Sequence, residues 1–309
     1  MRYNKKLKKM AKSNWNANNL PELSGKVIIV TGATSGLGKE ATEVLANKNA
    51  KVIMAIRNIT KGQQVVDEIK QQNANAQIEM IRLDLSSLSS VKTFVDEFII
   101  KYDRLDVLIN NAGIMFSPYE ETTEGFELQM GTNHFGHFAL TDQLMSILKK
   151  TPNSRVVVTS SLGHKMSKGI DFKDIHWNSR KYHERQAYFD SKLANIYFTY
   201  EFAKRYKNDT DAPIIAMAHP GWTSSGLQQH SPTMRFLNKF FGQEPKDGVL
   251  PTLRAAFGKD TKSGDFFGPS RFFEMHGNPI LVESSKLAKD AVNAKKLWDL
   301  SVELTKVNH

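Results

Sequence analysis

The sequence predicts a single-domain α/β fold, a doubly wound parallel sheet with helices on both faces. Two observations predict it: short, nearly continuous apolar runs recur along the chain, and stretches with helical spacing lie between them. Continuous apolar runs are typical of strands that are buried on both faces, as in a parallel sheet. Strands that alternate with helices form right-handed crossovers, which place helices on both sides of one sheet.

The expected elements follow in chain order. Six runs are expected to be strands: Val27–Val30, Val52–Ile56, Ile78–Leu83, Leu105–Ile109, Arg155–Thr159 and Ile214–Ala218. Six stretches are expected to be helices: Lys39–Lys48, Thr60–Gln72, Leu88–Lys101, Glu127–Lys149, Gln186–Tyr206 and Ser284–Thr305. Ligands of such sheets bind beyond the carboxyl ends of the strands, so motifs at those ends have functional weight.

Two segments interrupt this alternation. Residues 162–185 are polar and rich in His, Lys and Arg, whereas residues 222–243 carry several large apolar side chains. Both follow strand ends, where a substrate loop and a lid are expected. The apolar side chains of the second segment either form the lid or fill the core, and the sequence favours neither alternative.

Composition limits the class of protein. The chain has 309 residues, a net charge of +10 and no cysteine, which excludes disulfides and thiolate metal sites. Six of the positive charges lie between Arg2 and Lys12, so we expect a basic, flexible tail at residues 1–20 and one catalytic domain at residues 21–309. The remainder is only mildly basic, so no nucleic-acid partner is expected. Without a bilayer-spanning apolar run or a secretory signal, the protein is expected to be cytoplasmic.

A glycine-rich turn follows the first predicted strand. The segment Thr31-Gly32-Ala33-Thr34-Ser35-Gly36-Leu37-Gly38 runs directly into a helix. Glycines let the backbone pass close to a pyrophosphate, and a helix N-terminus offers free N–H groups and a partial positive charge. The glycine spacing differs from the commonest dinucleotide fingerprint, and a simple tight turn uses the same residue types.

Tyr188 and Lys192 lie four residues apart at the start of a predicted helix. This spacing puts both side chains on one helix face, so the ammonium can lie near the phenol. A nearby positive charge lowers the pKa of a tyrosine from its usual value of about 10. The pair therefore predicts a proton donor and acceptor, although an exposed pair on any helix has the same spacing.

Three motifs together resemble the short-chain dehydrogenases/reductases, in their single-domain branch. The turn Thr31–Gly38 resembles their cofactor loop, Asn110-Asn111-Ala112-Gly113 their motif after the fourth strand, and Tyr188-x-x-x-Lys192 their catalytic pair. The resemblance extends over residues 20–307 and is greatest for members similar to retinol dehydrogenases, protochlorophyllide reductases and WW-domain oxidoreductases. It implies a Rossmann-type fold and a nicotinamide cofactor, while the membrane-anchoring N-terminal helix of the retinol enzymes is expected to be missing.

The resemblance also implies roles for single residues. Ser161 matches the serine that hydrogen-bonds the substrate oxygen, with Ser160 as a competitor, and Asn133 matches the asparagine that holds a water near the lysine. Catalytic roles thus fall to Ser161, Tyr188, Lys192 and Asn133, without a metal. The implied cofactor-binding residues are Gly32, Thr34, Ser35, Gly36, Leu37, Gly38, Arg57, Asp84, Leu85, Asn111, Ala112, Gly113, Tyr188, Lys192, Pro220, Gly221 and Thr223. Asp84 and Asn133 also have purely structural alternatives, a helix cap and a polar residue satisfied within a helix.

The type of cofactor is predicted from charge. An NAD site usually has an acidic residue about 20 positions after the glycine loop, whereas an arginine accommodates the 2′-phosphate of NADP. No acidic residue lies between Glu43 and Asp67, and Arg57 stands 19 residues after Gly38. We therefore expect NADP(H).

These features predict an NADP(H)-dependent oxidoreductase that transfers hydride between the nicotinamide and a carbonyl or alcohol substrate, which is expected to be fairly apolar. The basic segment 162–185 instead favours a substrate with an acidic end. Two further alternatives are an NADPH-dependent reductase of an activated C=C bond and a non-catalytic NADP(H)-binding sensor. The sequence leaves open whether the protein is a monomer or a homo-oligomer.

Overall fold

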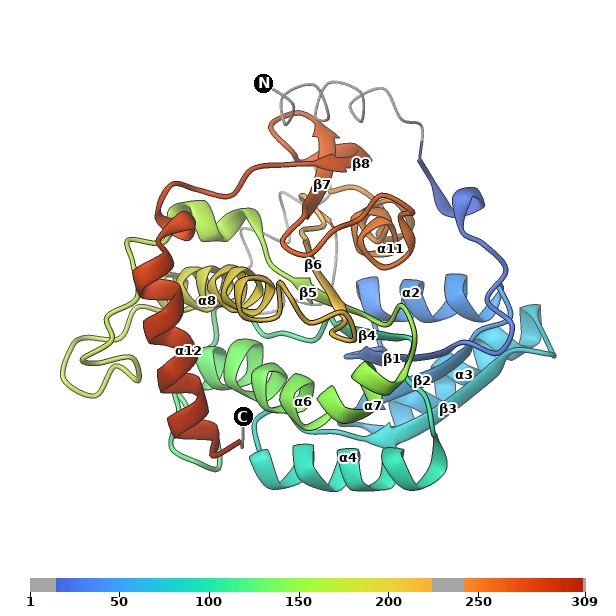
Figure 1. Cartoon of the computed structure of the whole chain (residues 1–309), viewed down its shortest axis with the longest axis horizontal. Coiled ribbons are helices and arrows are strands. Elements are labelled where there is room, and N and C mark those ends of the chain that lie inside the picture. Colours follow the sequence, from blue (N-terminus) through green and yellow to red (C-terminus); the bar gives the residue numbers. More distant parts are fainter. Residues whose placement is uncertain (1–14, 224–241, 308–309) are drawn as a thin grey trace.

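One eight-stranded sheet organises the part of the chain that the computed structural model describes, residues 15–223 and 242–307. Its strand order is β3-β2-β1-β4-β5-β6-β7-β8, and all neighbours are parallel except β7 and β8 (Figure 1). The strands are β1 (Val27–Thr31), β2 (Lys51–Ile56), β3 (Gln77–Arg82), β4 (Val107–Asn110), β5 (Arg155–Thr159), β6 (Ile214–Ala218), β7 (Phe266–Arg271) and β8 (His276–Leu281). The predicted fold class is confirmed.

Helices cover both faces of the sheet. The α-helices are α2 (Gly36–Ala46), α3 (Ile59–Gln72), α4 (Leu88–Lys101), α5 (Leu128–Met130), α6 (Gly136–Gln143), α7 (Met145–Lys150), α8 (Glu184–Arg205), α10 (Pro245–Gly248), α11 (Leu250–Phe257) and α12 (Ala291–Thr305). Short turns of other helix types are η1 (Ala17–Asn19), η3 (Leu162–Met166), η5 (Leu287–Lys289) and the π-helical turn η2 (Gly131–Phe135).

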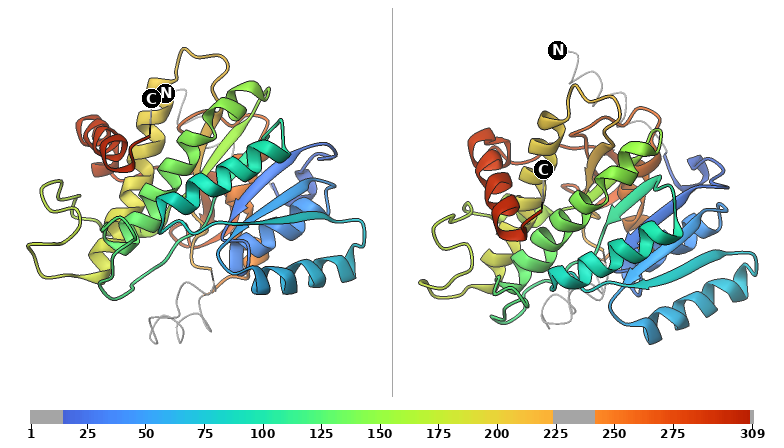
Figure 2. Two further views of the ribbon diagram at one scale, coloured as in Figure 1. Left: turned by 90° about the horizontal axis from the view of Figure 1, so that it is seen from below. Right: turned by 60° about the horizontal axis from the view of Figure 1, so that its bottom comes forward.

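Two hydrophobic cores hold the layers together. In β1 the side chains of Ile28 and Ile29 are both fully buried, yet they belong to different cores because successive strand residues point to opposite faces. One core packs the sheet against α4, α6 and α8, and the other packs it against α2, α3 and α11. Helix α12 lies against the outside of α8, as Figure 2 shows. Burial on both faces explains why the strands β1, β2, β4, β5 and β6 are nearly continuously apolar.

The strand order reverses between β1 and β4, which both lie in the middle of the sheet. At such a switch point the loops that leave neighbouring strands diverge to opposite faces and open a crevice beyond the carboxyl ends. The glycine-rich turn after β1 and the motif after β4 therefore lie side by side at this crevice.

Three expectations about elements need correction or comment. Strands β7 and β8 were not predicted, because Gly268, Pro269, Gly277 and Pro279 interrupt their apolar pattern. The single helix expected at 127–149 is wrong, since this stretch divides into α5, η2, α6 and α7. Most of the expected lid at 222–243, and residues 1–14 of the expected tail, lie outside the described residues.

The described remainder of the tail packs on the body. Trp15 is buried, and the guanidinium of Arg254 in α11 lies 5.7 Å from the centre of its ring. Asn16 caps η1 by accepting a hydrogen bond from the backbone N–H of Asn18. Among the described residues, no helix is long and apolar enough to cross a membrane.

Candidate active site

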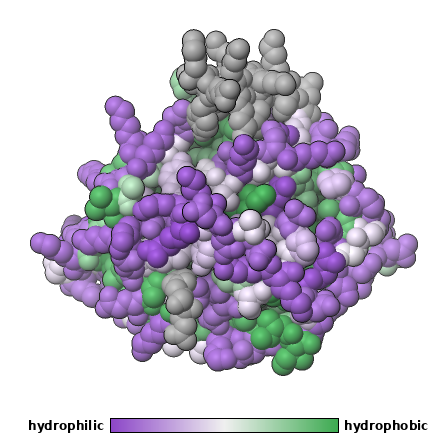
Figure 3. Space-filling model, viewed as in Figure 1, coloured by the Kyte–Doolittle hydropathy of each residue, from purple (hydrophilic) through white to green (hydrophobic). Residues whose placement is uncertain are grey.

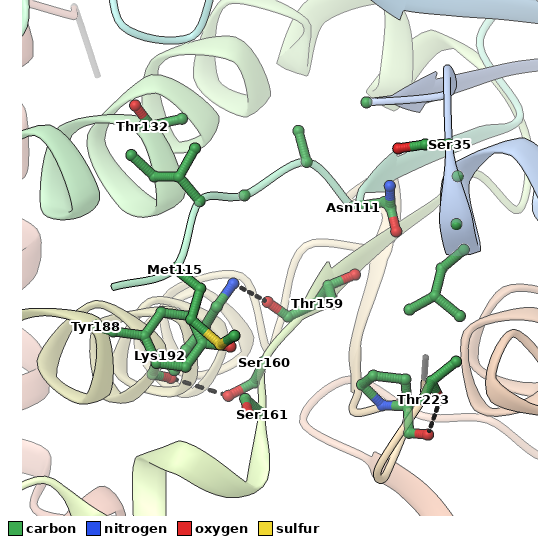
Figure 4. A pocket seen from close by; sticks show the side chains of 18 of the residues that line it. Ser35, Asn111, Met115, Thr132, Thr159, Ser160, Ser161, Tyr188, Lys192 and Thr223 are labelled. Carbon is green, nitrogen blue, oxygen red and sulfur yellow. Dashed lines mark hydrogen bonds between the residues drawn. The ribbon is translucent and has the colours of Figure 1, made fainter. Parts of the chain in front are cut away.

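A cavity of about 820 Å³ lies beyond the carboxyl ends of the central strands. All of the expected cofactor-binding residues, from Gly32 to Thr223, line it, and so does Ser161. Figure 4 shows Ser35 and Asn111 at one end and Ser161, Tyr188 and Lys192 at the other. Asn133 is the one expected site residue that does not line this cavity.

The turn after β1 is shaped by its glycines. Gly32 and Gly36 have φ angles of 66° and 52°, which favour glycine over residues with a side chain. A Cβ atom on Gly38 would lie 2.3 Å from the carbonyl oxygen of Gly32, so only glycine allows the helix to approach the turn this closely. At the start of α2, the Ser35 side chain makes no capping hydrogen bond. The first N–H groups of α2 are therefore available to an anion such as a pyrophosphate.

Thr31 joins this turn to the loop after β4. Its Oγ1 accepts hydrogen bonds from the backbone N–H groups of Asn111 and Ala112, both at 2.9 Å. The side-chain amide of Asn111 donates to the carbonyl oxygen of Thr31 at 2.8 Å. The two loops at the switch point are thus joined into one unit by hydrogen bonds within the protein.

The end of the cavity near β2 and β3 is polar and basic. Arg57, Asn58 and Lys61 line it, and the sequence analysis did not identify the last two. Asp84 also lines the cavity, while its carboxylate accepts hydrogen bonds from the backbone N–H and the hydroxyl of Ser86. Asp84 therefore also has the structural role of stabilising the turn before α4.

Tyr188 and Lys192 extend from α8 into the opposite end of the cavity. The Nζ of Lys192 lies 5.7 Å from the centre of the Tyr188 ring and 3.5 Å from the carbonyl oxygen of Thr159. The hydroxyl of Ser160 donates to the backbone carbonyl of Lys192 at 2.9 Å, whereas Ser161 hydrogen-bonds the phenol of Tyr188. The structure thus places Ser161, and not Ser160, beside the tyrosine hydroxyl.

Burial changes the acidity of both groups. It raises the pKa of Tyr188, and the hydrogen bond with Ser161 offsets only part of this effect. Burial also lowers the pKa of Lys192 to about 8. The expectation that the lysine lowers the tyrosine pKa is therefore wrong, because the loss of solvation on burial is the largest influence on the Tyr188 phenol.

Asn133 lies in η2, behind the cavity wall, and is fully buried. Its side chain accepts a hydrogen bond from the backbone N–H of Ile114 at 2.8 Å and donates to the Ile114 carbonyl at 3.0 Å. It also donates to the hydroxyl of Ser191 in α8 at 2.9 Å. A Cβ on Gly113 would lie 3.0 Å from the Asn133 Oδ1 and 3.3 Å from the Lys192 Nζ. Asn133 therefore ties the loop after β4 to the helix that carries Tyr188 and Lys192.

An apolar wall that was not predicted lies at the Tyr188 end of the cavity. It consists of Met115, Phe116, Met166, Phe189 and Met275. The ring of Phe116 meets the ring of Tyr188 edge to face at 5.3 Å, and its backbone has a φ angle of 55°. Met115 and Phe116 lie two and three residues after Gly113, the end of the loop motif after β4, so the sequence could have predicted that they lie near the cavity. Met275 comes from the unpredicted β7–β8 turn, and nothing in its local sequence indicates a site.

Comparison with known proteins gives consistent results. The short chain dehydrogenase family model matches residues 26–171. Human retinol dehydrogenase 11 is 38% identical over 286 residues, which cover 92% of this chain and 86% of that protein. Human retinol dehydrogenase 12 is 36% identical over 288 residues, with 92% and 87% covered.

Two solved structures are similar to this chain in both sequence and fold. An uncharacterized protein from Mycobacterium paratuberculosis is 38% identical with a TM-score of 0.78, covering 96% of this chain and 99% of its own. A short chain dehydrogenase from Shigella flexneri, complexed with NADP, is 25% identical with a TM-score of 0.64, covering 80% and 98%. From the curated relatives, the fold and the family match, we conclude that this chain belongs to the short-chain dehydrogenases/reductases of the retinol dehydrogenase type and is an oxidoreductase.

Proposed function

We propose that the protein is an NADP(H)-dependent oxidoreductase that interconverts a fairly apolar carbonyl compound and its alcohol. The observation that carries this proposal is the cavity itself. Tyr188, Lys192 and Ser161 meet at one end of it, and the free N-terminus of α2 and Arg57 lie at the other. The names of the curated relatives, retinol dehydrogenases, support an alcohol or aldehyde substrate.

The cavity has the features that a dinucleotide requires. The N–H groups at the start of α2 would hold the pyrophosphate, and Asp84, Leu85 and the loop after β4 would hold the adenosine side. Pro220, Gly221 and Thr223 would hold the nicotinamide end, and Thr223 Oγ1 donates to the carbonyl of Pro220 at 2.8 Å. When bound, the reduced nicotinamide supplies the hydride.

The preference for NADP(H) rests on positive charge after β2. Arg57 and Lys61 both line the cavity there, and Lys61 lies in the first turn of α3, four residues beyond Arg57. A guanidinium and an ammonium together suit the dianionic 2′-phosphate. The complex of the Shigella flexneri relative with NADP supports the same assignment.

Tyr188 acts as the general acid in the reducing direction. It donates its phenolic proton to the substrate oxygen as hydride reaches the carbonyl carbon, and it recovers the proton in the oxidising direction. Because burial raises its pKa, the phenol is protonated at neutral pH, which is the form that reduction requires. The hydroxyl of Ser161 donates to the developing alkoxide, and Lys192 stabilises the tyrosinate that remains.

Lys192 retains most of its charge near pH 7, because its pKa is about 8. Its second task is to hold the nicotinamide ribose. Asn133 supports this arrangement by holding the backbone at Ile114 and the hydroxyl of Ser191 in place. We propose that Asn133 acts through the residues that it positions and not by contact with the substrate.

The substrate end of the cavity favours an apolar compound. Met115, Phe116, Met166 and Phe189 offer a largely apolar surface beside Tyr188. Arg185 also lines the cavity, and its guanidinium lies 5.6 Å from the centre of the Phe116 ring. An acidic substrate end would meet this cation, so carboxylate-bearing aldehydes belong in the test.

The test mixes the protein with NADPH and separate aldehydes, ketones, quinones and conjugated enones, and the aldehydes include retinal and carboxylate-bearing compounds. We expect NADPH oxidation with apolar aldehydes or ketones and an alcohol product by chromatography, with Tyr188→Phe as the control. A saturated carbonyl product from the enones would instead support reduction of a C=C bond. Tight NADPH binding without any turnover would support a sensor, and full activity of Tyr188→Phe would refute the mechanism.

A further inference from the structure

The turn between β7 and β8 carries two exposed phenyl rings. Phe272 is 71% exposed and Phe273 is 95% exposed. Their φ angles are 49° and 54°, and that of Glu274 is 67°, so three successive residues other than glycine adopt the left-handed conformation. Such a backbone is unfavourable, and exposed phenyl rings add a second unfavourable contribution. The conformation of this turn and the exposure of its rings therefore both lower the stability of the folded protein.

The turn is firmly attached to the body beside the cavity. The carboxylate of Glu274 contacts the Nζ of Lys165 at 3.0 Å and the Nε2 of His219 at 3.1 Å. The carbonyl of the next residue, Met275, accepts a hydrogen bond from the N–H of Trp222 at 3.1 Å. Met275 and Trp222 both line the cavity. The rings thus project from a fixed point of the cavity rim.

A second exposed segment lies next to this turn. Met166 is 64% exposed and also lines the cavity, and its neighbours Lys165 and Lys168 are exposed. The ion pair between Lys165 and Glu274 joins the two segments. We define the rim surface as Lys165, Met166, Lys168, Arg271, Phe272 and Phe273. It combines three large apolar side chains with three cationic ones.

From this combination we propose that the rim surface docks on an anionic lipid bilayer. Phenylalanine side chains insert at the boundary between headgroups and acyl chains, and basic residues beside them bind anionic headgroups. The only acidic neighbour within the turn, Glu274, is already paired with Lys165 and His219. Docking there would place the cavity rim at Met166 and Met275 against the bilayer surface.

A second copy of the chain suits this surface less well. Copies most readily join through an open sheet edge, and β8 forms one edge of the sheet. Pro279 lies in the middle of β8 and has no N–H to donate to another strand. The basic character of the rim surface would also make two identical copies repel each other.

The first experiment measures co-flotation of the full-length protein with vesicles of phosphatidylcholine alone or with about one-third phosphatidylserine. We expect binding to the anionic vesicles, and at least about a tenfold weaker partition for the Phe272→Ser/Phe273→Ser variant. Arg271→Gln and Lys168→Gln should each weaken it about fivefold. NADPH affinity should stay unchanged, because none of these four residues lines the cavity.

The matched control uses another exposed apolar pair. Figure 3 shows a mainly hydrophilic face with a compact hydrophobic group low on the α4 side. On α4, Ile99 is 48% exposed and Ile100 is 85% exposed. Figure 1 places α4 at the end of the molecule opposite the β7–β8 turn. Ile99→Ser/Ile100→Ser should leave vesicle binding unchanged.

A second measurement locates the contact. The chain contains no cysteine, so Phe272→Cys and Ile100→Cys each provide one labelling site for a polarity-sensitive dye. We expect the emission to shift to the blue on anionic vesicles for the dye at position 272 only. Equal shifts at both positions would refute the proposal, and so would equal binding of the native protein and the Phe272→Ser/Phe273→Ser variant.

One outcome would assign the surface to a different occupant. If light scattering showed a dimer that Phe272→Ser/Phe273→Ser converts to a monomer, and no vesicle binding occurred, the rings would belong to an interface between copies. The bilayer proposal would then be wrong. The docking test does not depend on turnover, so its result and the result of the substrate test are independent.

Discussion

At the scale of single residues, the phenol of Tyr188 is the group on which the proposed chemistry depends. Replacing it with phenylalanine keeps the edge-to-face contact with Phe116 but removes the proton donor. We expect kcat to fall by about 10²- to 10⁴-fold while NADPH binding is retained. Steady-state kinetics together with cofactor titration measures both. Loss of cofactor binding in step with activity would show that the residue is structural.

We expect Arg57 to determine the preference for NADP(H) over NAD(H). Changing Arg57 to Gln removes a charged partner of the 2′-phosphate, so the Kd for NADPH should rise by about 10- to 100-fold while that for NADH stays constant. Arg82 provides the matched control, because it is exposed at the end of β3 and does not line the cavity. If Arg82→Gln weakened NADPH binding as much as Arg57→Gln does, the effect would be one of general surface charge. Arg57 would then not be a specific partner of the 2′-phosphate.

Asp190 makes stability depend on pH. Burial raises its pKa to about 6, while its Oδ1 accepts hydrogen bonds from Ser167 at 2.5 Å and Gln186 at 2.6 Å. Since the pKa in an unfolded chain is about 4, folding favours the protonated form. The contribution of Asp190 to the free energy of unfolding is fully present below pH 4 and is lost as the pH rises through 6. This loss amounts to at most about 3 kcal/mol.

The Asp190→Asn variant keeps a carbonyl acceptor without a charge. Between pH 4 and pH 7 the native protein should lose this contribution, whereas the variant should not. The free energy of unfolding of the variant should therefore rise relative to that of the native protein, as measured by urea denaturation at several pH values. Asp96→Asn, an exposed change on α4, serves as the control. A constant difference across this pH range would contradict the assignment.

For single residues, the sequence was sufficient to predict many of the side chains that line the cavity, but not how deeply each is buried or which groups it contacts. The spacing of Tyr188 and Lys192 places both on one helix face, and they do line one cavity. The direction of the tyrosine pKa was wrong, because the degree of burial depends on Phe116 and other residues remote in sequence. Likewise, two contacts that the sequence does not reveal distinguish the serines: Ser160 donates to the Lys192 carbonyl, whereas Ser161 hydrogen-bonds the phenol of Tyr188.

At the scale of elements, α12 supports α8, the helix that carries Tyr188 and Lys192. Trp298 is buried, and its ring centre lies 5.2 Å from that of Phe138 and 5.9 Å from that of Phe198. Trp298→Ala should lower the free energy of unfolding by about 3–5 kcal/mol, as measured by urea denaturation. Val292→Ala, an exposed change on the same helix, should alter it by less than about 0.5 kcal/mol. Equal effects would show that α12 contributes little to packing.

The elements that the sequence did not predict share a physical cause. The helix expected at 127–149 is interrupted at η2, followed by Gly136, where a Cβ would lie 2.3 Å from the carbonyl oxygen of Leu85. That close approach depends on a distant segment and leaves no periodic signal. Strands β7 and β8 form because the sheet offers a free edge at β6, although prolines weaken their local preference.

At the scale of the whole molecule, the alternation of strands and helices was sufficient to predict the layers. Crossover handedness and burial on both faces leave few arrangements for such a chain. The same layers bring together cavity residues from Gly32 to Met275, so cofactor binding should stabilise the entire fold.

At a concentration of one hundred times its Kd, NADPH should raise the free energy of unfolding by about 2.7 kcal/mol. Thermal unfolding with and without NADPH tests this expectation, with NADH at the same concentration as the control. An equal rise with NADH would contradict the preference for NADP(H).

The two ends of the cavity come from different stretches of the chain. The polar, basic end is built by loops between Gly32 and Gly113, whereas the apolar end is formed largely by side chains after Thr159. Thr31 and Asn111 fix the first end by hydrogen bonds within the earlier stretch. Substitutions of apolar residues in the later stretch, such as Met166 and Phe189, are therefore expected to alter the accepted substrate without disturbing the loops between Gly32 and Gly113. Because the two ends are separate in the sequence, proteins with this fold can come to accept different substrates while they keep the same cofactor.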